Sequence, residues 1–167
     1  MIPVAGVACF APVAYEGPAR ALVRGLKFRA ALDLTRAMAA PIAACAPRGM
    51  FADAALVPAP LVAVRRRARG FNQAAALAVA LAARTGRPVD DCLRRRGPPG
   101  SQVGRGRTGR QLALTGAVSC RGRAPERAVL VDDVITTGAT LAACARALRA
   151  AGSKEVSAVA YARTPGR

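Results

Sequence analysis

One short stretch constrains the fold of this 167-residue chain more than any other: an apolar run that leads directly into two acids. The run is Ala128–Val131, and Asp132 and Asp133 follow it without a break. A continuous apolar run of this length is typical of a strand that is buried on both faces of a parallel sheet. Strand and helix patterns alternate along the rest of the chain. The sequence therefore predicts an α/β fold with a central parallel sheet flanked by helices.

The turn after the acids has the composition of an anion-binding loop. It reads Thr136-Thr137-Gly138-Ala139-Thr140, and a helical apolar pattern begins at Leu141 and stops before Gly152. Gly138 lets the backbone bend tightly, and the first N–H groups of the helix favour a phosphate. Two carboxylates beside a phosphate imply ribose hydroxyls or a divalent cation between them. The stretch predicts a ribose 5-phosphate cradle, and an ordinary strand, turn and threonine-capped helix is the alternative.

The remaining helices are predicted from apolar spacing and from their end signals. One helix is expected to begin near Pro18, and a second over residues 30–40 should end or kink at Pro41. A third is expected over residues 73–84, with Asn72 as its N-cap. Lys27, near the end of the first helix, is either an anion contact or a solvated surface lysine.

Composition and charge narrow the chemistry. The net charge of +17 favours a polyanionic partner, either a phosphorylated ligand or nucleic acid, although coding bias also enriches arginine. Scarce aromatics weaken a base-stacking surface, and the absence of histidine excludes histidine-based catalysis. The five cysteines contain no CxxC pair, so we expect no zinc site. Because neither an apolar span nor a basic leader is present, we expect a cytoplasmic protein without a membrane span.

Two motifs resemble a known family. VLVDDVITTGATL, residues 129–141, closely resembles the phosphoribosyl pyrophosphate (PRPP) signature of type I phosphoribosyltransferases. VPAPLVAVRRRARGFNQAAALA, residues 57–78, resembles the ComF-like members of that fold, and so does Leu26-Lys27-Phe28. The resemblance runs from about Tyr15 to Arg163. The N-terminal zinc module that many ComF-like proteins contain has no counterpart in this sequence. It implies one type I phosphoribosyltransferase-like domain over 1–167, with an N-terminal hood portion at 1–50 and a core at 51–167.

The resemblance also implies a role for each part of the motifs. Asp132 and Asp133 would hold the ribose 2′ and 3′ hydroxyls and would contact Mg²⁺ only indirectly, through the ribose. The loop would hold the 5′-phosphate through Thr136, Thr137, Gly138, Ala139 and Thr140. The diphosphate side is expected at Arg66, Arg67, Arg69 and Gly70, a stretch that spacing alone leaves equally open as a solvated basic turn. Gln102 and Arg105 match a flexible closing loop over residues 97–110, for which a disordered basic linker is the alternative.

The implied activity is transfer of the 5-phosphoribosyl group from Mg²⁺-PRPP to a nitrogen acceptor, with release of diphosphate. Neither the acceptor nor the oligomeric state can be predicted. Two other functions stay open on the same scaffold. The protein could be a non-catalytic accessory of competence and DNA uptake that binds single-stranded nucleic acid, or a regulator that senses PRPP. Fold alone does not decide among the three.

Overall fold

The computed structural model describes residues 1–29, 32–61, 70–95 and 118–165 of the chain. Its elements, in chain order, are β1 (Ile2–Val4), β2 (Val7–Phe10), β3 (Val13–Ala14), α1 (Gly17–Arg29), α2 (Leu34–Cys45), β4 (Ala55–Pro58), α4 (Gln73–Thr85), β5 (Leu93–Arg95), β6 (Val118–Cys120), β7 (Arg127–Ile135), α6 (Ala139–Ala150) and β8 (Glu155–Arg163). Among the described residues, no helix is both long enough and apolar enough to cross a membrane.

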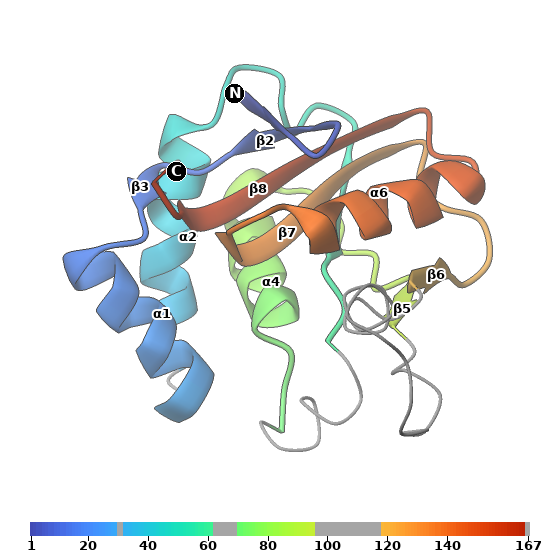
Figure 1. Ribbon diagram of the computed structural model, residues 1–167. Helices are drawn as coiled ribbons and strands as arrows, with labels where there is room; N and C mark the ends of the chain where they lie inside the picture. Colours follow the sequence, from blue (N-terminus) through green and yellow to red (C-terminus); the bar gives the residue numbers. More distant parts are fainter. Residues whose placement is uncertain (30–31, 62–69, 96–117, 166–167) are drawn as a thin grey trace.

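A six-stranded sheet forms the centre of the molecule (Figure 1). Its strand order is β1-β2-β8-β7-β4, and β3 also pairs with β8. β8 runs parallel to β2, β3 and β7, and β4 runs parallel to β7, whereas β1 is an antiparallel edge strand beside β2. β5 and β6 form a separate antiparallel pair. The predicted α/β class, with a largely parallel central sheet and flanking helices, is confirmed.

The interior strand β7 separates two hydrophobic cores. Val129 and Val131 pack into the core that α1, α2 and α4 share, whereas Ala128 and Leu130 pack into the core beneath α6. Figure 1 shows α6 on one face of the sheet and α2 and α4 on the other. Successive side chains of a strand point to opposite faces, so a strand covered on both sides must be apolar throughout. This requirement explains the uninterrupted run that the sequence contains.

Two boundaries differ from the sequence-based expectation. β7 continues through both acids to Ile135, and Asp132 lies opposite Ala160 of β8 in the ladder. The acids are therefore held inside a hydrogen-bonded strand. Helix α2 continues past Pro41 to Cys45, so proline does not end it. A proline removes one backbone hydrogen bond of the helix, and the burial of Met38 and Ile42 on either side of it offsets that loss.

The beginning of α4 is fixed by Asn72, as the sequence predicted. Its Oδ1 accepts a hydrogen bond from the Ala74 N–H at 3.1 Å, which caps the helix. Its Nδ2 donates to the carbonyl of Ala59 at 3.0 Å, just beyond β4. One side chain thus ties the first turn of α4 to the end of β4. This connection places the N-terminus of α4 beside the carboxyl ends of β4 and β7, where the site lies.

Candidate functional site

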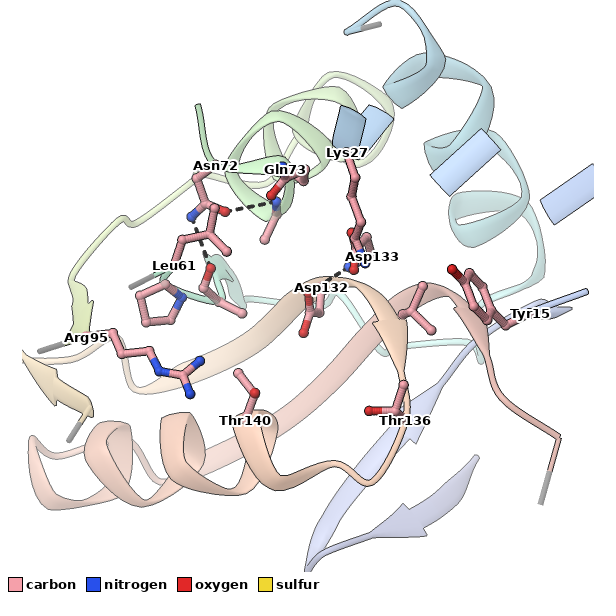
Figure 2. Close-up of a pocket in the computed structure, with 14 residues that line it drawn as sticks. Tyr15, Lys27, Leu61, Asn72, Gln73, Arg95, Asp132, Asp133, Thr136 and Thr140 are labelled. Carbon is pink, nitrogen blue, oxygen red and sulfur yellow. Dashed lines mark hydrogen bonds and ion pairs between the residues drawn. The ribbon is translucent and has the colours of Figure 1, made fainter. Parts of the chain in front are cut away.

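A cavity of about 250 Å³ opens where β4 and β7 end. Such crevices at the carboxyl ends of parallel strands are the usual ligand sites of α/β sheets. Figure 2 shows Lys27 reaching toward the acids from α1, with Thr136 and Thr140 on the opposite side and Arg95 to the left. The lining residues come from six parts of the chain: Tyr15, Lys27, Ala59, Pro60, Leu61, Asn72, Gln73, Ala74, Arg95, Asp132, Asp133, Val134, Thr136 and Thr140.

The second acid of the pair is buried and has a cation beside it. The Asp133 side chain is 9% exposed, and its Oδ2 lies 3.0 Å from Nζ of Lys27, which is 24% exposed. A buried carboxylate is stable only when paired or hydrogen-bonded, so this ion pair compensates for the loss of solvent. Lys27 is therefore a half-buried residue of the site, which excludes the solvated surface position that the sequence left open.

The first acid is in a less favourable environment for a charge. Burial, and then the neighbouring charge of Asp133, raise the pKa of Asp132 from its ordinary value of 3.8 to about 7. The backbone N–H of Asp133, which donates to Asp132 Oδ1 at 2.8 Å, opposes this rise, as do the charges of Lys27 and Arg95. Near neutral pH Asp132 is therefore present in both its protonated and its ionised form.

The threonine-rich turn forms a second, smaller cavity of about 40 Å³ that shares lining residues with the first. Gly138 stands at the N-terminus of α6 with a φ of 74°, a left-handed conformation that favours glycine. A Cβ at Gly138 would collide with Val4, at the end of β1, and would also approach Ala5. The Ala139 N–H donates weakly to Oγ1 of Thr137 at 3.4 Å. The turn between β1 and β2 thus packs against the outside of the threonine-rich loop, and this loop leads directly into the first turn of α6.

The structure brings most of the sequence-predicted site residues together. Asp132, Asp133, Thr136 and Thr140 line the larger cavity, and Thr137, Gly138 and Ala139 line the smaller one. Gly70 is exposed with a φ of 77° and is not among the lining residues. The remaining predicted positions lie outside the described residues: Arg66, Arg67, Arg69, Gln102 and Arg105.

Several lining residues were not singled out from the sequence. Tyr15 enters from the segment between β3 and α1, Gln73 from the first turn of α4, and Arg95 from the end of β5. Asn72 was predicted only as a helix cap. Tyr15 is the one aromatic residue in the described lining, which no local pattern predicts. Asn72 and Gln73 lie at the start of the helix predicted over residues 73–84, and this position is the signal that could have found them.

The donor set fits a magnesium ion that is brought by a ligand. In the described ranges, no group of three or more histidine, cysteine or acidic side chains could hold a metal ion. Carboxylate oxygens are nevertheless the donors that Mg²⁺ prefers, and it commonly binds through one or two carboxylates together with substrate phosphates. Asp132 and Asp133 are the carboxylates of this cavity.

Comparison with known proteins identifies the family. Residues 61–167, more than half of the chain, match the phosphoribosyl transferase domain family. The chain belongs to this family and has its α/β fold, so it is a phosphoribosyltransferase-like protein. Among curated proteins no match is found.

Two solved structures resemble the chain at low sequence identity. The allosteric regulatory enzyme of purine biosynthesis is 22% identical over 75% of this chain, with a TM-score of 0.45. UMP synthase of Leishmania donovani is 17% identical over 83% of this chain, with a TM-score of 0.41. The match covers 25% and 23% of those chains, so this chain spans about a quarter of the length of each.

Proposed function

We propose that the protein binds PRPP and transfers its 5-phosphoribosyl group to a nitrogen acceptor, releasing diphosphate. One observation carries this proposal: two cavities that share Asp132, Thr136 and Thr140 place the adjacent acids beside the threonine and glycine loop that begins α6. A ligand with a phosphate at one end and vicinal hydroxyls beside it matches that arrangement. Membership of the phosphoribosyl transferase domain family supports the same ligand.

In this proposal the two halves of the ligand bind to different chemistry. The 5′-phosphate accepts hydrogen bonds from the loop Thr136–Thr140, where the helix dipole and the first backbone N–H groups of α6 favour an anion. The ribose hydroxyls donate to Asp132 and Asp133, which the β7 ladder holds at fixed positions. Mg²⁺, bound with PRPP and contacting the acids through the ribose, would neutralise charge on the departing diphosphate. Arg66, Arg67, Arg69 and Gly70 are proposed for the diphosphate side.

Catalysis would then rest on positioning and charge. As the C1–diphosphate bond breaks, positive charge develops on the ribose and negative charge on the leaving group. The Asp132 and Asp133 carboxylates lie on the ribose side, and Arg95 adds a cation to the cavity lining. Gln102 and Arg105 are proposed to close over the site and exclude water, which competes with the nitrogen nucleophile. We assign no general base to the described residues of the cavity.

At the level of subfamily, we propose a ComF-like protein that acts in the cytoplasm as one domain over residues 1–167. The motifs at 57–78 and 129–141 support this assignment. Asn72 of the first motif supports it structurally, because its two hydrogen bonds position α4 at the cavity. The hood portion contributes Tyr15 and Lys27 to the same cavity, which supports a role of residues 1–50 in the site.

Calorimetric titration with PRPP, with and without Mg²⁺, tests the proposal. We expect saturable binding by the wild type and loss of that binding in the double variant Asp132→Asn/Asp133→Asn. A second assay would screen nitrogen bases and amines for acceptor-dependent diphosphate release. A wild type that folds but does not bind PRPP would contradict the proposal. Binding without diphosphate release from any acceptor would favour a PRPP-sensing regulator.

The net charge of +17 favours one further candidate, a non-catalytic protein that binds single-stranded nucleic acid. A contact that neutralises several phosphates loses affinity steeply as salt rises. Fluorescence anisotropy with a labelled single strand at increasing salt would measure this slope. A steep slope without PRPP binding would favour the accessory role in DNA uptake over the transferase.

A further inference from the structure

Lys27 lines the cavity but lies outside residues 61–167, which match the phosphoribosyl transferase domain family. The family match begins at residue 61, whereas Lys27 stands in the third turn of α1. Its Nζ lies 3.0 Å from Oδ2 of Asp133, and both side chains line the cavity. Figure 2 shows the lysine extending from α1 toward the acid pair. Only one other lysine, Lys154, exists in the chain, so this position is unusual in a protein whose cations are mostly arginines.

The charges around Asp133 show why a cation is needed there. Asp132 is its neighbour in β7, Lys27 approaches from α1, and Arg95 enters the cavity from β5. Cys144 of α6 lies near Asp132, and burial followed by the Asp132 charge raises the pKa of its thiol to about 12, so it is neutral. Tyr15 completes the titratable groups of the described lining. Two adjacent acids in this setting repel each other unless a cation compensates at least one of them.

We propose that Lys27 is a positioning residue that supplies, at Asp133, the positive charge for which a divalent cation would otherwise be needed. The proposal rests on the proposed function. The ammonium group of Lys27 fixes the orientation of the Asp133 carboxylate through Oδ2. The carboxylate is thereby oriented to accept a hydrogen bond from a ribose hydroxyl. A ligand that carries a ribose 5-phosphate but no diphosphate therefore binds without a divalent cation. Mg²⁺ is needed only for the diphosphate of PRPP.

Calorimetry with ribose 5-phosphate tests this role, because this probe has the hydroxyls and the phosphate but no diphosphate. We expect the wild type to bind it equally well in EDTA and in Mg²⁺. Lys27→Met should lose about tenfold or more in EDTA, because Asp133 is left buried and uncompensated, and should regain affinity in Mg²⁺. Lys27→Arg, which keeps the charge, should bind in EDTA far better than Lys27→Met.

Two controls separate positioning from a merely structural effect. Lys154→Met removes the other lysine, whose partner Glu126 lies 2.7 Å away in an exposed ion pair, and it should leave binding unchanged. Inorganic phosphate, which uses only the loop, should bind Lys27→Met and the wild type alike.

Each remaining outcome overturns the inference. It is wrong if Lys27→Met binds ribose 5-phosphate like the wild type in EDTA, if Mg²⁺ does not restore affinity, or if phosphate binding falls in parallel. A wild type that binds PRPP but requires Mg²⁺ for ribose 5-phosphate overturns this inference alone. A wild type that binds neither compound overturns the proposed function as well.

Discussion

Replacing Asp132 with asparagine is expected to stabilise the protein at neutral and alkaline pH. The pKa of Asp132 is raised from 3.8 to about 7 by burial and by the charge of Asp133. Between these two values the folded state keeps a proton that the unfolded chain has lost. The free energy of unfolding of the wild type therefore falls as pH rises through this window, and it stays reduced above it. Asparagine carries no charge, so the free energy of unfolding of the variant should not fall in this way as pH rises.

The magnitude follows from the size of the shift. A change from 3.8 to about 7 corresponds to about 4 kcal/mol at most. Relaxation of the site and water in the cavity reduce such penalties, so we expect the variant to gain about 2 kcal/mol over the wild type at pH 8. The gain should shrink steadily toward pH 4. Asparagine can still accept the hydrogen bond that the Asp133 N–H donates at 2.8 Å, so little else should change.

Urea unfolding followed by far-ultraviolet circular dichroism, at constant ionic strength from pH 4 to pH 8, measures this difference. Asp91→Asn is the matched control, because that carboxylate is 54% exposed in an ion pair with Arg94. The difference in the free energy of unfolding between Asp91→Asn and the wild type should not depend on pH in the way expected for Asp132→Asn. A difference between Asp132→Asn and the wild type that stays constant across this pH range would refute the reasoning. The same variant should bind ribose 5-phosphate less well, because stability and binding oppose each other at this residue.

Three further predictions concern the loop, the α4 cap and the thiols. Gly138→Ala should lower the free energy of unfolding by about 2 kcal/mol, from left-handed strain and contact with Val4, and Val4→Ala should recover part of this in urea unfolding. In the same assay, Asn72→Ala should lower the free energy of unfolding by about 1–2 kcal/mol. Asn72→Asp keeps the helix cap but loses the hydrogen bond to the Ala59 carbonyl, so it should lower the free energy of unfolding by less. With Ellman's reagent at pH 8, the exposed thiol of Cys45 should react fast. The buried thiol of Cys144 has a pKa of about 12 and should react only on unfolding. Cys45→Ser should remove the fast phase of the reaction.

Features that depend on neighbouring residues were predicted well. The β7 strand, the turn after it and the α6 helix follow from a buried apolar run, a glycine and a helical spacing within one stretch. The Asn72 cap follows equally from its place before a helical run. In these cases the forces that determine the structure act within about one turn of the chain, so local sequence contains them.

Features that depend on distant contacts were not predicted. Pro41 lies inside α2 because buried side chains of that helix offset the missing hydrogen bond. Lys27 is indistinguishable in sequence from a surface lysine, and only the packing of α1 against the core brings it to Asp133. Val4 lies against Gly138 because β2 pairs with β8, a contact between the two ends of the chain. No periodic pattern indicates such approaches.

The lining of the cavity is collected from α1, α4, β5, β7 and α6, which are separated by long stretches of sequence. A ligand that fills the cavity would contact several of these elements at once, so opening one of them would break ligand contacts. Local unfolding of α1 or of the α4 N-terminus is then coupled to loss of the ligand. Occupancy of the site should therefore make unfolding more cooperative, and the slowest amide exchange should extend from the central strands into α1.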